Sequence, residues 1–172
     1  LERFSLSRAK NFSSLSYGQK KKFLLAFGLA TNARLLLLDE PTNGLDIPTK
    51  SSLRKLLVEA LTNDRMIIIS THQVRDVENL IDHIIIVDKG KIIFNENMFD
   101  VSQQLTISHT QEIKETDEVL FREKTLGGYS VMTKNQSGKS CDKIDLELLF
   151  NAVINEQNKM GKIFSKEDSY VQ

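Results

Sequence analysis

Two adjacent carboxylates directly follow a short apolar run. Asp39 and Glu40 come after residues 35–38, which are all leucine, and such a run predicts a strand buried on both faces. An aspartate at the end of this strand could hold Mg²⁺, because the ion prefers oxygen ligands and keeps several waters. The next carboxylate could reach the water that attacks a phosphate, so the pair suits phosphoryl transfer. For an isolated pair, a solvated strand end would be the simpler explanation.

A histidine follows the next apolar run. Residues 66–69 are Met-Ile-Ile-Ile, and Ser70, Thr71 and His72 come directly after them. The imidazole is small, directional and able to donate, so His72 could bond a γ-phosphate or orient the attacking water. A lone histidine is more often structural. In an α/β sheet, however, ligands bind at the carboxyl ends of parallel strands, which is where all these polar residues are expected.

A third candidate lies just before a predicted helix, in residues 15–19 with the sequence Leu-Ser-Tyr-Gly-Gln. Free backbone N–H groups, the Ser16 hydroxyl and the positive end of the helix dipole could converge there on an anion. Gly18 permits a close backbone approach. Taken alone, Ser16 is equally well explained as a helix N-cap, and Asp46 could likewise cap the helix that follows it.

Alternating helices and strands would position these residues. Apolar side chains at helical spacing in residues 19–31 predict a largely buried helix, with the lysines at 20–22 on a solvated face. Asp46 and Pro48 predict the start of an amphipathic helix. The spacing of apolar residues over 74–81 predicts another helix after the second strand. The pattern favours an α/β sheet with parallel members.

The second half of the chain has a different character. Residues 84–94 predict a hairpin in which Gly90 supplies a positive φ, and residues 106–118 are polar. The other expected elements are strands over 119–123 and 129–133, a loop over 135–143, a helix from Asp145, and a polar, frayed tail.

In this order and spacing, the candidate residues resemble the motifs of the ABC ATPase family. The matches are residues 15–19 (signature motif), 35–40 (Walker B strand), 43–46 (D-loop) and 70–72 (switch-histidine loop). The resemblance covers residues 1–105 and implies part of an α/β P-loop NTPase core of the ABC type. Residues 106–172 would then be a small appended module of a hairpin and a helix, with a frayed tail.

The resemblance also implies roles. Asp39 would ligate Mg²⁺, Glu40 would be the general base that polarises water, and His72 would contact the γ-phosphate of ATP. Family members act as head-to-tail dimers with ATP sandwiched between the subunits, so the signature motif works on the partner's nucleotide.

Within the signature motif, the resemblance assigns nucleotide contacts to Ser16, Gly18 and Gln19. Asp46 would link the two sites of the dimer. Tyr17 departs from the family, which usually has glycine there, and this difference could alter how closely the loop approaches ATP.

The family's phosphate-binding loop, Gly-x-x-x-x-Gly-Lys-Ser/Thr, is expected upstream of this chain, together with the adenine-stacking aromatic and the Q-loop glutamine. The tripeptide Gly138-Lys139-Ser140 resembles the end of such a loop, but Thr133 stands where its first glycine is required. We therefore expect residues 1–172 alone neither to bind ATP tightly nor to hydrolyse it. The open sheet edges could favour dimerisation or strand swapping.

The composition of the chain limits the classes of binding partner. Lysine plus arginine equals aspartate plus glutamate at 23 each, so no overall basic field favours nucleic acid, and no nucleic-acid partner is expected. No apolar run approaches the roughly twenty residues of a membrane span. The single cysteine, Cys141, cannot form an internal disulfide.

The resemblance implies the ATP-binding subunit of a transporter, working with a second ATP-binding subunit and a transmembrane permease at the inner face of the cell membrane. The sequence Gln-Lys-Lys-Lys at residues 19–22 is more similar to exporter-type subunits than to importers. The alternative is a soluble ABC ATPase acting on ribosomes or DNA, which would need tandem cassettes or a long coiled-coil insertion. Residues 106–154 could be a regulatory or docking module, or could simply pack on the core.

Overall fold

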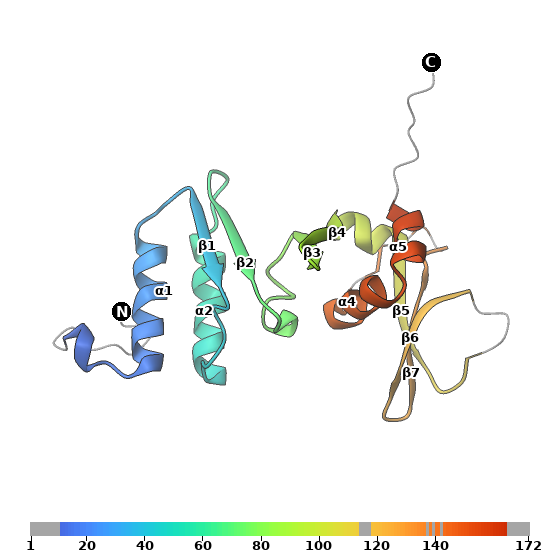
Figure 1. Ribbon diagram of the computed structural model, residues 1–172, viewed down its shortest axis with the longest axis horizontal. Coiled ribbons are helices and arrows are strands. Elements are labelled where there is room, and N and C mark those ends of the chain that lie inside the picture. The colour runs from blue at the N-terminus through green and yellow to red at the C-terminus, as the bar shows by residue number, and fades with distance from the viewer. Residues whose placement is uncertain (1–10, 114–117, 137, 139, 142, 165–172) are drawn as a thin grey trace, which may run out of the picture. The chain divides into compact units, whose positions relative to one another are not determined.

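The structure is a computed structural model, and it describes residues 11–113, 118–136, 138, 140–141 and 143–164. The chain divides into two compact units, Leu1–Leu80 and Ile81–Gln172 (Figure 1). The first described element is the short 3₁₀ helix η2 (Phe12–Ser14). Among the described residues, no helix has both the length and the apolar character that crossing a membrane requires.

A parallel pair of strands forms the centre of the first unit. β1 (Leu35–Asp39) and β2 (Met66–Ser70) pair along their whole length, with Asp39 opposite Ser70. Parallel neighbours need a crossover connection, which α2 (Ile47–Ala60) supplies. The predicted α/β arrangement with parallel strands is therefore confirmed.

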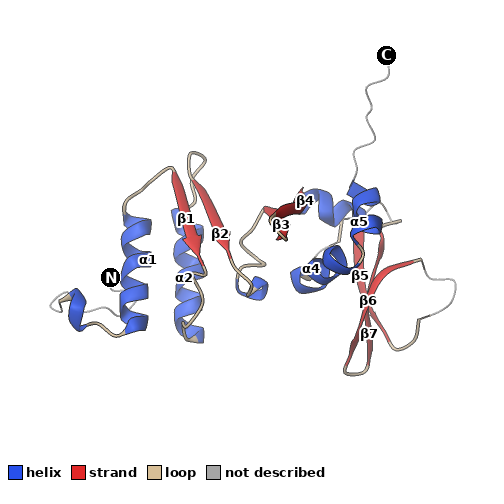
Figure 2. Cartoon of the chain, in the orientation of Figure 1, coloured by secondary structure: helices blue, strands red, loops and turns tan. Residues whose placement is uncertain are grey.

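Both helices of the first unit cover the same face of this sheet. α1 (Tyr17–Ala30) and α2 lie together on one side of β1 and β2 (Figure 2). The inward side chains of Leu38, Ile67 and Ile69 pack against the core between the layers. That core consists of Leu25, Leu45, Leu53 and Leu57.

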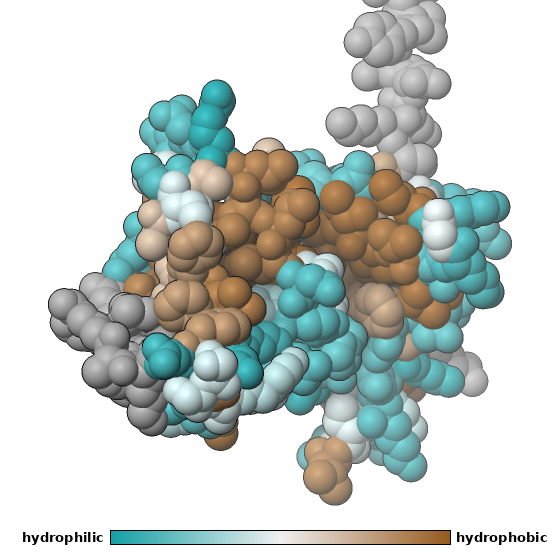
Figure 3. All heavy atoms as spheres, turned by 60° about the vertical axis from the view of Figure 1, so that its left-hand side comes forward, coloured by the Kyte–Doolittle hydropathy of each residue, from teal (hydrophilic) through white to brown (hydrophobic). Residues whose placement is uncertain are grey.

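The opposite face of the sheet is open, which corrects the prediction that the strand of residues 35–38 is buried on both faces. Leu35, Leu37, Met66 and Ile68 keep 53%, 66%, 62% and 48% of their surface exposed. Successive side chains of a strand point to opposite faces, and the described helices cover only one of them. Apolar side chains accordingly gather on the surface of the first unit, which comes forward in Figure 3.

The expectation of a largely buried first helix is also wrong. Within α1 only Leu25 is buried, whereas Leu24 and Phe27 are 57% and 60% exposed. The helix buries one stripe against its neighbours, and on its other sides Phe27 stacks on the Phe23 ring, with the ring centres 6.4 Å apart.

Arg65 joins the carboxyl ends of the two helices. This residue is only 9% exposed, and its guanidinium donates to the carbonyls of Gly28 and Leu29 in α1 and of Ala60 in α2, at 3.3–3.5 Å. The last carbonyls of a helix lack partners within the helix and carry partial negative charge. One buried cation therefore satisfies the ends of both helices.

The chain after β2 does not form the predicted helix. Only a 3₁₀ turn, η3 (Val74–Asp76), is present, and Val77 ends it with φ −121° and ψ −3°. Valine, asparagine and aspartate have low helix propensity, and the apolar spacing that suggested a helix is met by turns that bury Val77. This segment is held instead by side-chain bonds to α2, described below.

The second unit opens with the predicted hairpin. β3 (His83–Asp88) pairs antiparallel with β4 (Lys91–Asn97), and the turn places Lys89 and Gly90 at φ +48° and +75°. Both turn residues have positive φ, as a two-residue hairpin turn of type I′ requires.

A second antiparallel sheet follows in the order β5-β7-β6. β6 (Val119–Thr125) and β7 (Gly128–Lys134) confirm the two predicted strands, whereas the polar stretch after residue 105 contains a strand that was not foreseen, β5 (Leu105–Thr110). Gly128 has φ +147°, and a Cβ atom there would lie 2.1 Å from the carbonyl oxygen of Thr110. The contact between β7 and β5 therefore requires glycine.

Helices complete the second unit. α3 (Met98–Gln104) precedes β5, and α4 (Leu146–Asn155) begins as predicted after Asp145, whose carboxylate accepts from two backbone N–H groups of the first turn. The prediction of a frayed tail is wrong for residues 157–164, which form the helix α5 (Gln157–Phe164). In this helix Met160 is buried, and the Phe164 ring meets the Phe94 ring edge-on. The rest of that tail lies outside the described residues.

Candidate active site

The predicted acidic residues lie at the carboxyl edge of the parallel pair. Asp39 is the last residue of β1 and faces Ser70, the last residue of β2. Glu40 extends this contact, because its backbone N–H donates to the Ser70 carbonyl at 2.8 Å. The pairing therefore brings the residues that follow both strands together, including His72.

Glu40 is bonded to the segment that follows β2. Its Oε2 accepts from the Thr71 hydroxyl at 3.0 Å, and its Oε1 lies 3.0 Å from the backbone nitrogen of His72 and 2.5 Å from the ring nitrogen Nδ1. The side-chain hydrogen bond to His72 is the main reason that the pKa of the Glu40 carboxyl lies below its ordinary value, and the other donors act in the same direction against partial desolvation. Glu40 is therefore ionised at neutral pH.

Asp39 offers an oxygen site for a cation. Its Oδ1 accepts from the Ser70 hydroxyl at 2.5 Å, and its side chain is exposed. Among the described residues there is no cluster of three or more histidine, cysteine, aspartate or glutamate side chains that could hold a metal by themselves. One carboxylate and one hydroxyl suit Mg²⁺, which typically takes one or two protein carboxylates and completes its shell with water and phosphate oxygens.

The backbone of Glu40 has an uncommon conformation. Its φ is +44°, in the left-handed region that residues other than glycine rarely adopt. Its carbonyl accepts from the backbone N–H of Asn43 at 3.3 Å and from the Lys21 ammonium at 2.5 Å. Lys21 also donates to the Asn43 carbonyl at 2.8 Å. Backbone strain of this kind often occurs at functional sites.

Asp46 ends the turn that follows Glu40. Its Oδ1 accepts from the backbone N–H of Thr49 at 2.8 Å, so it caps α2 as predicted. The pKa of Asp46 lies below its ordinary value. The largest cause is the side-chain hydrogen bond with Thr49, followed by the backbone hydrogen bond with Thr49, and the positive charge of Lys22, 3.9 Å away, contributes less.

The predicted anion-binding segment forms the start of α1. Ser16 is the N-cap and makes a capping box with Gln19: its hydroxyl accepts from the Gln19 N–H at 3.3 Å, and its own N–H donates to Gln19 Oε1 at 3.1 Å. Gly18 lies in the first turn. Tyr17 is 77% exposed, and a Cβ atom added at Gly44 would lie 3.8 Å from its ring. The capping role is therefore present, and the exposed tyrosine ring lies beside the turn after Glu40.

Side chains of α2 hold the segment that contains His72. Lys50 donates to Asp76 Oδ2 at 2.6 Å and to Gln73 Oε1 at 3.1 Å. Arg54 donates to the Asp76 carbonyl at 3.4 Å, and its charge lies 4.0 Å from the carboxylate. These bonds fix the chain on the far side of His72, whose own side chain remains 70% exposed.

Sequence reasoning missed the two lysines that organise this edge. Lys21 belongs to a run of three lysines that was interpreted as a solvated face, and Lys50 has no motif around it. The spacing of Lys21 from Ser16 could have placed it one turn into the helix, but nothing in the sequence indicates that its ammonium reaches the Glu40 and Asn43 carbonyls.

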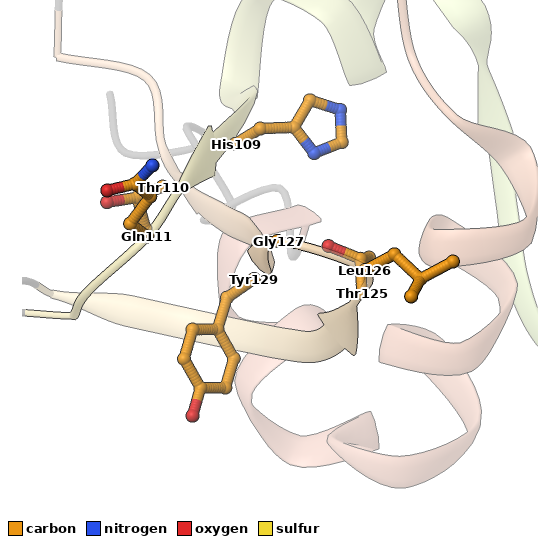
Figure 4. A pocket seen from close by; sticks show the side chains of 7 residues that line it. All are labelled: His109, Thr110, Gln111, Thr125, Leu126, Gly127 and Tyr129. Atoms are coloured by element: carbon orange, nitrogen blue, oxygen red, sulfur yellow. The ribbon is translucent and has the colours of Figure 1, made fainter.

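The second unit contains a pocket with no such chemistry. Figure 4 shows its lining, in which the side chains of His109, Leu126 and Tyr129 point in different directions. The full lining is His109, Thr110, Gln111, Thr125, Leu126, Gly127 and Tyr129. His109 Nδ1 lies 3.0 Å from the Ser130 hydroxyl, which gives this histidine a structural partner. The pocket includes none of the predicted site residues.

Comparison with known families gives a match over the first unit. Residues 7–75 match the family model described as "AAA domain, putative AbiEii toxin, Type IV TA system". This span includes α1, both parallel strands and every residue proposed for the site.

Individual relatives extend the match. An energy-coupling factor transporter ATP-binding protein of Mycoplasmoides gallisepticum is 33% identical over 58% of this chain and 31% of its own length. A chelated iron transport system membrane protein of Yersinia pestis is 37% identical over 52% of this chain and 31% of its own. A manganese transport system ATP-binding protein of Synechocystis is 30% identical over 78% of this chain and 46% of its own. The chain thus spans less than half the length of these relatives.

The fold is of the α/β class, with the candidate residues at the carboxyl edge of parallel strands, and residues 7–75 resemble an AAA-type domain. Within this class, the chain is a relative of the ATP-binding proteins of ABC transporters over much of its length. The resemblance predicted from the sequence motifs is therefore confirmed.

Proposed function

We propose that the first unit carries the hydrolysis half of an ATP site, in the ATP-binding subunit of an ABC transporter. The observation that carries the proposal is the meeting of Asp39, Glu40 and His72 at one edge of the parallel sheet, with Glu40 Oε1 2.5 Å from His72 Nδ1. The names of relatives that are ATP-binding proteins of transport systems support the same activity.

Glu40 acts as the general base in this proposal. Its depressed pKa keeps it ionised at neutral pH. Oε2 accepts from the Thr71 hydroxyl and has a lone pair left for a proton from water. Oε1 is occupied by two donors from His72. Oε1 therefore positions the carboxylate, and Oε2 accepts the proton.

His72 links the base to the phosphate. When Nδ1–H donates to Glu40, the neutral ring leaves Nε2 without a proton, so a hydrogen bond from Nε2 to a phosphate requires the protonated imidazolium. The exposed position of the ring leaves Nε2 accessible to a nucleotide.

Asp39, with Ser70 beside it, would hold Mg²⁺. A bound Mg²⁺ supplies charge neutralisation for the phosphate oxygens. Asp39 needs no other acidic side chain for this role, because the nucleotide and water provide the remaining ligands.

The amino end of α1 would serve the nucleotide of a second ATP-binding subunit. Ser16, Gly18 and Gln19 lie at a helix start whose N–H groups and dipole attract anions. Asp46, at the start of α2, would link the two sites. The capping box does not exclude this role, because the Ser16 hydroxyl is exposed and also has a proton to donate.

We place the complete protein at the inner face of the cell membrane, bound to a transmembrane permease. The exporter-like sequence at residues 19–22 is the only feature that favours export. Relatives named for energy-coupling factor, manganese and chelated iron transport do not support that direction.

We also propose that residues 1–105 correspond to the ATPase domain and residues 106–172 to an appended module. Nucleotide binding by residues 1–172 alone is a separate point. Loops of the form Gly-x-x-x-x-Gly-Lys-Ser/Thr bind nucleotide phosphates, and residues 1–172 contain no such segment. Residues 1–172 alone are therefore expected neither to bind ATP tightly nor to hydrolyse it.

The test is phosphate release from MgATP by the polypeptide that carries this chain together with a phosphate-binding loop. Glu40→Gln keeps the shape of the side chain but removes the base, and we expect hydrolysis to fall about 100-fold or more while ATP binding persists. Glu123→Gln, at an exposed position of β6, is the matched control. Equal activity of the Glu40→Gln variant and the wild type would refute the proposal.

A further inference from the structure

The ammonium of Lys21 connects the helix that begins at Ser16 to the main chain of the proposed base. It donates to the Glu40 carbonyl at 2.5 Å and to the Asn43 carbonyl at 2.8 Å, residues 19 and 22 positions further along the chain. An ammonium has three donors and no acceptor, so two of its donors are used by one four-residue turn.

Hydrogen bonds hold the Glu40 backbone on both sides, and Lys21 supplies one of the two at its carbonyl. Its N–H donates to the Ser70 carbonyl of β2, and its carbonyl accepts from Asn43 N–H and from Lys21. Between these anchors the residue has φ +44°, which a non-glycine residue keeps only when its surroundings hold it there. Relaxation of this φ toward the usual negative range would rotate Cβ, and with it the carboxylate, about the N–Cα bond.

We propose that Lys21 is a positioning residue, which holds the backbone of Glu40 in its left-handed conformation and so aims the carboxylate at the site. This inference deepens the proposed function and rests on it for its kinetic part. The environment agrees with the assignment: burial lowers the pKa of Lys21, whereas the nearby charges of Glu40 and Asp39 raise it, as expected for an ammonium drawn into a partly desolvated site.

The other lysines of the same run provide the contrast. Lys20 lies over the Phe12 ring, with its ammonium 5.8 Å from the ring centre, and Lys22 lies 3.9 Å from Asp46. Only Lys21 donates to main-chain carbonyls of the turn after β1. Lys20→Met is therefore a control that removes the same charge from the same helix without touching Glu40.

The first experiment compares steady-state ATP hydrolysis by Lys21→Met, Lys21→Arg and Lys20→Met in the polypeptide that includes the phosphate-binding loop. Lys21→Met keeps the aliphatic stem but has no donor, and we expect kcat to fall about tenfold or more with KM for MgATP within about twofold, because a displaced base affects chemistry rather than binding. Lys21→Arg should recover part of the loss, and Lys20→Met should stay within about twofold of wild type.

The second experiment does not depend on activity. Amide hydrogen exchange at Asn43, whose N–H bonds the Glu40 carbonyl, should accelerate about tenfold or more in Lys21→Met and remain unchanged in Lys20→Met, at equal melting temperature. Unchanged exchange at Asn43 in a folded Lys21→Met variant would overturn the inference. If the wild type does not hydrolyse ATP but exchange accelerates, the positioning role stands and the proposed function fails.

Discussion

The parallel sheet of the first unit and the three-stranded sheet of the second unit use their surfaces in opposite ways. In the first unit, one face of the parallel pair is open, with Leu37 66% exposed, whereas Met132 in the central strand of the second unit is fully buried. At the strand ends the contrast reverses. The ends of β1 and β2 carry a network of polar contacts around Glu40, whereas the β6–β7 turn presents a fully exposed Leu126. The first unit depends on hydrogen bonds for its site, and the second depends on packing for its stability.

The sharpest test of this contrast compares two leucines. Leu149 of α4 is completely buried, so Leu149→Ala should lower the free energy of unfolding of the second unit by about 2–5 kcal/mol. Leu37→Ala on the open sheet face should change the stability of the first unit by less than about 0.5 kcal/mol. Denaturant dependence of hydrogen exchange in β7 and β1 measures the two units separately. Similar losses for both variants would break the comparison.

A smaller effect is expected at the joined helix ends. Arg65→Met retains most of the buried stem but leaves the carbonyls of Gly28, Leu29 and Ala60 without this donor, and should destabilise the first unit by about 1–3 kcal/mol. Chemical denaturation followed by exchange in α1 is the measurement. Arg34→Met, at an exposed position before β1, is the control. If both variants lose the same amount of stability, the hydrogen bonds of Arg65 do not contribute specifically to the stability of the first unit.

The smallest expected effect concerns the stability of the first unit at acidic pH. The pKa of Asp46 is lower in the folded state, so its charge stabilises the first unit above its unfolded pKa of about 3.9, and this stabilisation disappears as pH falls through the folded value. Asparagine also caps helices well, so Asp46→Asn isolates the charge. The stability difference from wild type should be constant above about pH 5 and shrink below about pH 4. Asp64→Asn, in an exposed loop, serves as the control, and a difference that grows on acidification would contradict the assignment.

The sequence was most informative where local chemistry decides the structure. Ser16 and Asp46 cap helices as predicted, and Asp145 caps the helix expected from that position, because a side chain that bonds the next turn needs no tertiary context. The parallel pairing of the two apolar runs and the hairpin at Gly90 also followed from composition and turn chemistry.

Tertiary contacts decided the rest. Four consecutive leucines predict burial on both faces, but the sequence does not indicate which face has a partner, and in the described residues only one does. The apolar spacing of residues 74–81 was mistaken for a helix because Val77 is buried by a turn. α5 was missed because its stability depends on Met160 and Phe164 reaching distant partners.

The candidate site divides in the same way. Its acidic residues and histidine could be predicted, because parallel pairing brings the ends of both strands to one edge. The positive φ of Glu40 and the contacts of Lys21 and Lys50 could not, since they depend on side chains crossing between elements. Whether Asp39, Glu40 and His72 perform their proposed roles stays a prediction until the variants are measured.

Gly128 limits which sequences can retain the second unit. Because even a methyl group there would lie 2.1 Å from a backbone oxygen of the adjacent strand, no rotamer change could relieve the overlap. In a saturation mutagenesis library, position 128 should therefore tolerate no replacement, while neighbouring Leu126, which is fully exposed, should accept most. An insertion or a fused reporter would accordingly be placed at Leu126 and kept away from the glycine two residues later.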